Sequence, residues 1–315
     1  MHRPKPPWLK VKAPGGERYA WIKTAARTQG LHTVCEEARC PNIGECWGGG
    51  TATFMVMGDI CTRGCRFCAV ETRRRGAPLD TDEPQKLAQT IAAMKLDYVV
   101  VTSVNRDDLP DQGAGHFAAC IQAIRAAAPS TLVETLVPDF MGRLDLVQVI
   151  VDAQPDVYSH NLETVERLTP RVRDPRAGYA QSLATLAHVK RLDPDRLTKS
   201  SVQIGHGESA LEVLQAMGDL RAAGVDFLTL GQYLRPSDKH LEVVEYVTPD
   251  VFDQYRELGL GLGFQFVASG PLVRSSYRAG EYFIRDYLRK GGTARVRPAG
   301  LPVEGGGVDP AAGLG

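Results

Sequence analysis

Six of the seven cysteines lie close together in the chain, between Cys35 and Cys68. Three occur in CEEARCPNIGEC, with the spacing C-x4-C-x5-C, and three in CTRGCRFC, with the spacing C-x3-C-x2-C. A structural zinc site uses four protein ligands, whereas CTRGCRFC offers three thiols and no nearby histidine. Iron–sulfur cubanes are held by thiolates, and three thiolates leave one iron open. CTRGCRFC therefore favours an iron–sulfur cluster with an open iron over a zinc site.

The charge and composition narrow the class of protein. Among 315 residues, Lys and Arg total 37, as do Asp and Glu. The global field typical of nucleic-acid binders is therefore missing, and we expect no nucleic-acid partner. The N-terminus MHRPKPPWLKVK lacks the apolar core of a signal peptide, and no run approaches the roughly 18 apolar residues of a membrane span. We expect a cytoplasmic protein with no membrane partner. The cytoplasm is reducing, so clustered cysteines there favour metal binding over disulfides.

Short apolar runs alternate with amphipathic stretches from Thr53 onward. The runs are typical of strands, and they cover residues 53–58, 98–103, 131–137, 156–161, 201–205, 226–231 and 264–269. Residues 83–96 and 210–224 are typical of the helices between them. This alternation predicts an α/β fold with a parallel sheet, because parallel neighbours need long crossover connections. Six or seven repeats favour a partial TIM-type barrel, whose chemistry lies at the carboxyl ends of the strands. A doubly wound open sheet is the alternative fold, but no glycine-rich dinucleotide-binding fingerprint follows the first predicted strand.

The chain divides into four predicted segments. Residues 1–51 precede the first strand and form an N-terminal extension that carries the first cysteine triplet. Residues 52–270 form the barrel core, and residues 271–292 form a C-terminal segment that includes the stretch RSSY. Residues 293–315 are rich in Gly, Pro and Ala with few large apolar residues, which predicts a disordered tail.

The spacing of CTRGCRFC, with Phe67 before its last cysteine and a first strand before the loop, resembles the radical S-adenosylmethionine superfamily. The other triplet, Cys35, Cys40 and Cys46, lies N-terminal to this motif and restricts the resemblance to fewer families of that superfamily. Together with VTSVNRDDLPDQGAGHF, HNLET, LTLGQYLRPS and RSSY, it is similar to the lipoyl synthase family over residues 30–285. The resemblance implies a partial (β/α)6 barrel whose N- and C-terminal extensions close an auxiliary cluster site.

The resemblance also implies two 4Fe–4S clusters and S-adenosylmethionine as cofactors. Cys61, Cys65 and Cys68 would hold the radical cluster, whose open iron chelates S-adenosylmethionine and splits it to a 5′-deoxyadenosyl radical. The auxiliary cluster would be held by four residues, which are Cys35, Cys40, Cys46 and a serine of RSSY. We favour Ser275 over Ser276, although the sequence alone does not distinguish them. An oxygen ligand suits this place, since oxygen holds iron less firmly than thiolate in a cluster that gives up sulfide.

Five further residues are candidates for S-adenosylmethionine binding, from their places near strand ends and from the resemblance: Thr102, Ser103, Glu134, Asn161 and Lys199. No catalytic residue beyond the cluster ligands is expected, because the cofactors carry the radical chemistry. The implied reaction is a sulfurtransferase reaction that inserts two sulfur atoms, taken from the auxiliary cluster, at C6 and C8 of a protein-bound octanoyl-lysine.

The resemblance implies several protein partners. The substrate would be an octanoylated lipoyl carrier domain, either of a 2-oxoacid dehydrogenase E2 component or of the glycine cleavage H protein. A ferredoxin or flavodoxin-type reductant would supply electrons, and an iron–sulfur carrier protein would rebuild the auxiliary cluster. The sequence does not distinguish between the carriers.

Other interpretations remain open from the residues alone. Each triplet can be a structural metal site, and Ser275 and Ser276 can be a helix N-cap. A biotin synthase-like enzyme would lack the first triplet paired with RSSY. A two-cluster electron carrier needs four cysteines per cluster and far fewer residues. Cys120 has helical apolar spacing and is expected to be a small core residue.

Overall fold

The sheet of the protein is an open barrel of mostly parallel strands. The computed structural model describes residues 4–11, 14–37, 40–48, 51–276, 284, 286–288 and 290. Its eight-stranded sheet has the order β1-β2-β5-β6-β7-β8-β9-β10, and only β1 pairs antiparallel to its neighbour within the described residues. The strands are β1 His32–Thr33, β2 Thr53–Val56, β5 Tyr98–Ser103, β6 Leu132–Leu136, β7 Val157–Ser159, β8 Leu197–Ile204, β9 Phe227–Gln232 and β10 Phe266–Gly270. The predicted α/β class and partial TIM-type barrel are confirmed.

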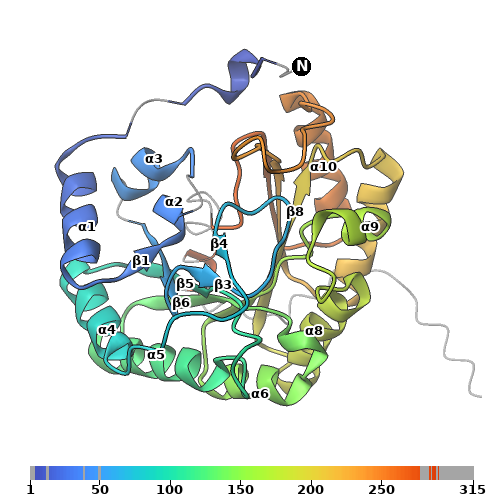
Figure 1. Cartoon of the computed structure of the whole chain (residues 1–315). Coiled ribbons are helices and arrows are strands. Elements are labelled where there is room, and N and C mark those ends of the chain that lie inside the picture. Colours follow the sequence, from blue (N-terminus) through green and yellow to red (C-terminus); the bar gives the residue numbers. More distant parts are fainter. Residues whose placement is uncertain are drawn as a thin grey trace, which may run out of the picture.

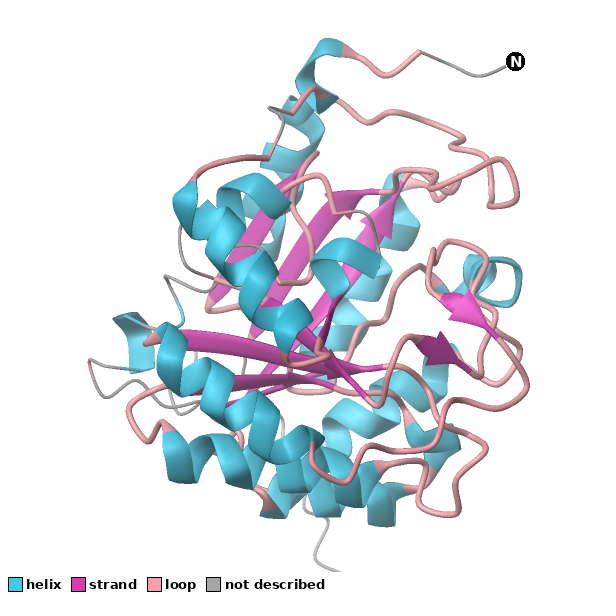
Figure 2. Cartoon of the chain, turned by 60° about the vertical axis from the view of Figure 1, so that its left-hand side comes forward, coloured by secondary structure: helices cyan, strands magenta, loops and turns pink. Residues whose placement is uncertain are grey.

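Six crossover helices cover the outside of this sheet (Figures 1 and 2). They are α4 Glu83–Met94, α5 Ala114–Ala127, α6 Leu144–Asp152, α8 Tyr179–Leu192, α9 Ala210–Ala222 and α10 Pro249–Gly261. Alternate residues of a strand face opposite sides of the sheet. Val99 and Val101 of β5 therefore pack outward, in one buried cluster with Leu87 of α4 and Ile121 of α5.

Local sequence determines where α9 begins. Ser209 accepts a hydrogen bond from the backbone N–H of Glu212, and the Glu212 carboxylate accepts one from the backbone N–H of Ser209. This reciprocal capping satisfies two N–H groups that a helix start leaves without partners. The strand before α9 is longer than expected, because β8 begins at Leu197 rather than at residue 201. Its polar residues are paired inside the fold, as Thr198 is with Asp226.

A separate apolar cluster fills the inside of the barrel below its mouth. Tyr98 and Val100 of β5 belong to it, together with Val157 and Phe227 from later strands. Ile284, from beyond the last strand, is fully buried in the same cluster. The C-terminal part of the chain therefore returns to the barrel interior and closes its lower end.

Short elements surround the mouth of the barrel. The N-terminal ones are η1 Pro7–Leu9, α1 Glu17–Thr28, α2 Val34–Glu37 and α3 Ile43–Gly48. The small parallel sheet of β3 Ile60–Cys61 and β4 Glu71–Thr72 lies across the middle of the helical arc in Figure 1. The remaining short helices follow strands β6 and β7, and they are η2 Phe140–Gly142, η3 Glu166–Leu168 and α7 Thr169–Val172.

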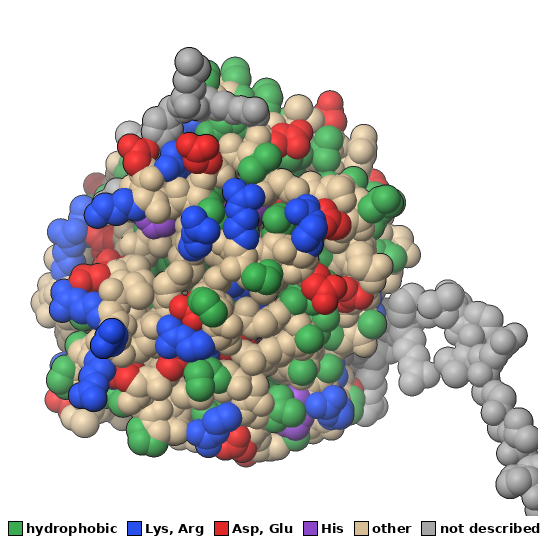
Figure 3. All heavy atoms as spheres, turned by 45° about the vertical axis from the view of Figure 1, so that its right-hand side comes forward, with side chains coloured by type: hydrophobic (Ala, Val, Ile, Leu, Met, Phe, Trp, Pro, Cys, Tyr) green, Lys and Arg blue, Asp and Glu red, His purple; other side chains and the backbone are tan. Residues whose placement is uncertain are grey.

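Two predictions concern the ends and the surface of the chain. The predicted disordered tail, residues 293–315, lies outside the described residues. No helix in the described part is both long and apolar enough to cross a membrane. On the face shown in Figure 3, basic and acidic side chains are interspersed, as the equal totals of the sequence suggest.

Candidate functional site

Both cysteine triplets open onto one cavity of about 520 Å³. Its walls come from the strands toward their carboxyl ends, including Thr102 in β5, Leu136 at the end of β6 and Ser201 in β8. All six cysteines of the two triplets line it. The alternating strands and helices thus bring to one place two triplets that lie on different segments, at the edge of the barrel where catalytic groups are expected.

The loop that carries CTRGCRFC is fixed to the neighbouring loop after β5. The backbone N–H of Thr62 and its hydroxyl both donate to the carbonyl of Asn105, at 2.9 and 3.0 Å. The Thr62 hydroxyl oxygen in turn accepts a hydrogen bond from the backbone N–H of Asp107 at 3.0 Å. The position of Cys61 therefore depends on backbone contacts between two loops.

Several N–H groups point at the sulfur atoms of this triplet. Cys61 Sγ accepts from the backbone N–H groups of Arg63 and Asn105, at 3.4 and 3.3 Å. Cys65 Sγ accepts from the backbone N–H of Asp174 at 3.4 Å. Burial nevertheless raises the pKa of the Cys65 thiol to about 11 and that of Cys68 to about 12. Burial thus disfavours the thiolate form of these two cysteines, while the N–H donors favour it.

A buried ion-pair network lies directly behind the loop. The Arg63 guanidinium donates to both oxygens of Asp107, at 2.8 and 2.9 Å, and to Asp139 at 2.6 Å. Its side chain is 2% exposed. Burial opposes the charge of Arg63, but Asp107 and Asp139 outweigh burial and raise its pKa. Asp174 adds a further contact, since it accepts the backbone N–H of Gly64 at 2.8 Å.

The first triplet is carried by short N-terminal elements. Cys35 lies in α2 and Cys46 in α3, and both are buried, while Cys40 lies between them. The backbone N–H of Cys40 donates to the carbonyl of Cys35 at 3.1 Å. Burial raises the pKa of Cys40, and the nearby Arg274 partly offsets this.

The C-terminal segment closes the cavity over this triplet. Asn42, inside the triplet, donates to the carbonyl of Leu272 at 2.6 Å. Gly231 of β9 allows the close approach, because a Cβ there would collide with the carbonyl of Val273. Ser275 and Ser276 both line the cavity. Segments more than 200 residues apart in the sequence are therefore in direct contact at the site.

The two serines have different surroundings. The Thr53 hydroxyl donates to the Ser276 hydroxyl oxygen at 2.9 Å. The Ser275 side chain has no hydrogen-bond partner among the described residues. Of the two hydroxyls at the cavity wall, that of Ser275 is the one without a competing contact.

Comparison with known proteins agrees with this geometry. A family profile described as the radical SAM superfamily matches residues 55–220, and one described as the N-terminal domain of lipoyl synthase matches residues 2–40. A lipoyl synthase of Anaeromyxobacter sp. (strain Fw109-5) is 62% identical over 284 residues, which cover 90% of this chain and 96% of that relative. The chain belongs to the lipoyl synthase family.

Other matches extend the comparison. A mitochondrial lipoyl synthase of Branchiostoma floridae is 56% identical over 290 residues, 90% of this chain and 77% of that relative. The crystal structure of methylornithine synthase superposes with a TM-score of 0.52 at 10% identity, covering 82% of this chain and 80% of that one, and it supports the fold alone. The chain is thus a lipoyl synthase and a radical SAM enzyme, as predicted. This family uses S-adenosylmethionine with a 4Fe–4S cluster and carries a second, auxiliary cluster.

The described residues fit these cofactors. Six thiols are the donor set that iron–sulfur clusters need, and three polar atoms of the cavity wall are buried without a hydrogen-bond partner in the described structure. These atoms are Ser103 Oγ, Asn105 Oδ1 and Asp139 Oδ2. A buried polar atom costs free energy unless it is hydrogen-bonded, so such atoms mark a place for a polar ligand.

Three of the five residues predicted to bind S-adenosylmethionine line the cavity, and two do not. Thr102, Ser103 and Asn161 are in its wall. Glu134 and Lys199 lie outside it, one strand layer deeper, where Lys199 Nζ donates to both carboxylate oxygens of Glu134 at 2.9 Å. Their side chains are 1% and 2% exposed. The two side chains therefore do not line this cavity, because strand-end position alone does not say which side of the sheet a side chain faces, and their part in binding S-adenosylmethionine stays a prediction.

Glu134 and Lys199 instead form a paired layer inside the barrel. The carboxylate of Glu134 also accepts hydrogen bonds from the hydroxyls of Tyr98 and Ser159, at 2.5 and 2.9 Å. Buried charges need such pairing, because desolvation is costly. Since Tyr98 belongs to the apolar cluster inside the barrel, this pair is in direct contact with that cluster.

Sequence reasoning missed Glu163, which lies in the wall of the cavity. Its carboxylate accepts hydrogen bonds from Asn161 at 3.0 Å and from Gln203 at 2.8 Å. Burial raises the pKa of Glu163, and Arg173 partly offsets this. The signal was present, since Glu163 belongs to the quoted stretch HNLET, but a single acidic residue in a loop is usually solvated.

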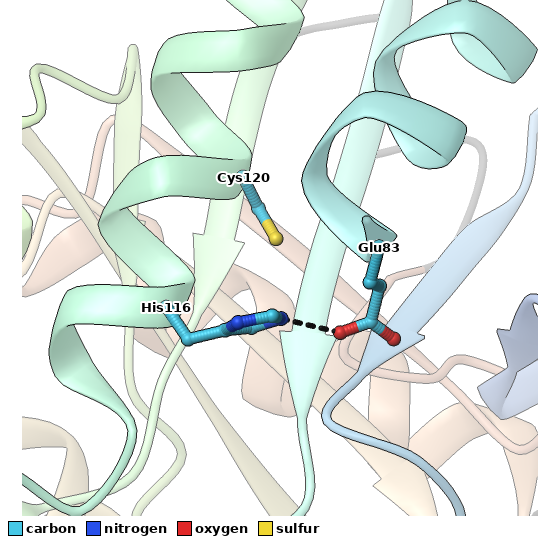
Figure 4. A group of neighbouring side chains, drawn as sticks. All are labelled: Glu83, His116 and Cys120. Carbon is cyan, nitrogen blue, oxygen red and sulfur yellow. Dashed lines mark hydrogen bonds and ion pairs between the residues drawn. The ribbon is translucent and has the colours of Figure 1, made fainter. Parts of the chain in front are cut away.

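A second cluster of potential ligand atoms lies between α4 and α5 (Figure 4). Atoms of Glu83, His116 and Cys120 all lie within 4.8 Å of one another. The Glu83 carboxylate already accepts the backbone N–H of Met57 at 2.9 Å and contacts His116 Nε2 at 2.6 Å. Cys120 is fully buried, as expected for a core residue. The cluster therefore fastens two helices to the end of β2, just before the CTRGCRFC loop.

Proposed function

We propose that the two triplets hold two clusters with different roles in lipoyl synthesis. Cys61, Cys65 and Cys68 would hold the radical cluster, which leaves one iron for S-adenosylmethionine. Cys35, Cys40, Cys46 and Ser275 would hold the auxiliary cluster, from which sulfur is taken. The observation that carries this proposal is that both triplets and Ser275 line one cavity.

The cofactors supply the one-electron chemistry and the sulfur when they are bound, since methylene hydrogens have no acidity for a base to use. The chain's own residues position the reactants. Apolar side chains in the wall, among them Val34, Leu136 and Val202, suit an alkyl chain such as octanoyl. The polar wall formed by Thr102, Ser103 and Asn161 suits S-adenosylmethionine.

We propose a direct test of sulfur insertion. The full-length protein, reconstituted anaerobically, is incubated with an octanoyl-lysine peptide, dithionite and S-adenosylmethionine. Mass spectrometry should detect the gain of two sulfur atoms at the octanoyl chain. Cleavage of S-adenosylmethionine without any sulfur gain would contradict the proposal and leave a different radical enzyme.

The carrier is proposed to dock at the N-terminal segment. Lys5 lines the cavity, and Trp8 beside it is 37% exposed. Lys10 and Lys23 add positive charge to the same segment, in which Glu17 is the one acidic residue among residues 1–23. An acidic carrier domain, E2 or H protein, would be attracted to this segment mainly through the association rate.

Reversing the charges of Lys5, Lys10 and Lys23 together should slow carrier association and remove most of its salt dependence. Surface plasmon resonance at low and high salt measures both. A matched control is charge reversal at Lys239 and Lys290, which lie outside the N-terminal segment. If the triple variant and the double variant change the association rate and its salt dependence equally, docking at the N-terminal segment is contradicted.

Further proposals follow from the family assignment. Residues 1–51 and 271–292 would act as extensions of a barrel core at 52–270, closing the auxiliary cluster site from two sides. A ferredoxin or flavodoxin-type reductant and an iron–sulfur carrier protein would serve the two clusters. The location would be the cytoplasm, and detection of the tagged protein in a membrane fraction or an organelle would contradict it.

A further inference from the structure

One side chain donates a hydrogen bond to a sulfur of the radical triplet. Asn105 Nδ2 lies 3.7 Å from Cys61 Sγ, and the backbone N–H of the same residue lies 3.3 Å from it. With the backbone N–H of Arg63, Cys61 therefore has three N–H donors. The other hydrogen bonds to these sulfurs described above come from backbone groups. A side-chain substitution at Asn105 can therefore remove one donor and leave the backbone donors in place.

The side chain of Asn105 can be changed without displacing Cys61. The backbone carbonyl of Asn105 holds Thr62, through its N–H and its hydroxyl. These contacts, and the backbone N–H that reaches Cys61, survive any substitution that keeps the local backbone. The side-chain amide is thus an addition to a loop arrangement that the backbone already fixes.

The orientation of the amide follows from its contacts. Only the NH₂ group can donate, so the nitrogen faces the sulfur and Oδ1 faces away. Oδ1 is buried with no partner in the described structure, and Asn105 lines the cavity. Because the amide gains nothing else within the described residues, its contact with sulfur is its principal interaction.

Hydrogen bonds to cluster sulfurs help to set the reduction potential. A donor stabilises the reduced cluster more than the oxidised one, because reduction adds negative charge at the sulfurs. We infer that the Asn105 side chain raises the reduction potential of the cluster held by Cys61, Cys65 and Cys68, and so eases the electron transfer that begins each turnover. This inference rests on the proposed assignment of that triplet.

The test is an EPR-monitored redox titration of the full-length protein. The background carries Cys35→Ala, Cys40→Ala and Cys46→Ala, so that the radical cluster alone contributes. Asn105→Leu removes the donor, and Asn105→Asp keeps the shape but removes the donor and adds charge. At a fixed reductant poise we expect the ratio of reduced to oxidised cluster to fall about tenfold in Asn105→Leu, equivalent to about 59 mV for one electron. The ratio of reduced to oxidised cluster should be lower still in Asn105→Asp.

Tyr233→Phe is the matched control, since Tyr233 lines the same cavity but its hydroxyl donates to the carbonyl of Leu241 and to no cysteine sulfur of the described residues. It should leave the potential unchanged. An equal shift in Tyr233→Phe would overturn the inference in favour of general cavity polarity. An unchanged potential in both Asn105 variants, with iron content preserved, would also overturn it, as would loss of the cluster in both.

The failure of the proposed function has a different signature. If the background protein forms no cluster whose EPR signal responds to S-adenosylmethionine, the assignment of the triplet falls. If that cluster forms and responds, but its potential does not depend on Asn105, only the redox role of Asn105 falls.

Discussion

The two cysteine triplets face one cavity but are held in different ways. The triplet of Cys61, Cys65 and Cys68, which we propose holds the radical cluster, lies on a barrel loop, with backbone N–H donors at Cys61 and Cys65 and the buried ion pairs of Arg63 behind it. Two cysteines of the first triplet lie in helices of four and six residues and the third lies between these helices, and Asn42 in the same stretch contacts the C-terminal segment. One site is thus built within the barrel, and the other is assembled from two distant parts of the chain. This difference suits one cluster that persists and one that is taken apart.

Removing the ligands should produce the largest contrast. Substitution of Cys61, Cys65 and Cys68 by Ala should abolish formation of 5′-deoxyadenosine, because the iron that chelates S-adenosylmethionine is lost. Substitution of Cys35, Cys40 and Cys46 should leave that product but abolish lipoyl formation. Chromatography of the small molecule and mass spectrometry of the peptide separate the two. Equal loss of 5′-deoxyadenosine in both folded variants would remove the functional difference between the triplets.

The serine pair sharpens the comparison at one atom. Ser275→Ala should stop lipoyl formation while 5′-deoxyadenosine is still made, because a cluster ligand is lost. Ser276→Ala should keep most of the activity, since it loses only the contact with Thr53. If both variants retain full lipoyl synthesis, neither serine is a ligand.

A substitution at Arg63 tests whether the buried ion pairs behind the CTRGCRFC loop stabilise the cluster proposed for Cys61, Cys65 and Cys68. Arg63→Met leaves Asp107 and Asp139 buried without that partner, which should cost about 3–5 kcal/mol of unfolding free energy. We expect the radical cluster to be lost before the auxiliary one, measured by iron content and Mössbauer spectroscopy alongside denaturant unfolding. Arg75→Met, at an exposed position on the same segment, is the matched control and should be nearly neutral. Equal loss of both clusters would show that the network serves the whole fold.

Asn42 should give the smallest effect. Asn42→Ala removes the part-buried hydrogen bond to the carbonyl of Leu272, and the net loss of such a hydrogen bond costs about 0.5–1.5 kcal/mol. The loss should appear as faster proteolysis near residues 271–276 and a lower yield of lipoyl product. The rate of S-adenosylmethionine cleavage should stay unchanged, and a parallel fall in that rate would contradict the separation of the two sites.

Much of the fold was predictable because the signals are local. The strand runs at 98–103 and 226–231 match β5 and β9 closely, since parallel strands are buried on both faces and read as continuous apolar runs. β8 was predicted too short, because its first residues, Leu197 to Ser200, include polar groups that are satisfied only by distant partners such as Asp226 and Glu134. Polar residues in a strand look like a loop until those partners are known.

The sequence by itself determined the cysteine spacings, the order of strands and helices, and therefore the edge at which the chemistry lies. Each of these is a short-range property of the chain. The tertiary structure decided which side chains share the cavity. It placed Ser275 in the wall of the same cavity as a triplet more than 200 residues away, brought Asn105 to the sulfur of Cys61, and paired Glu134 with Lys199 outside the cavity wall. Such contacts depend on barrel curvature and on which face of a strand a residue occupies, and no local pattern encodes how distant segments meet.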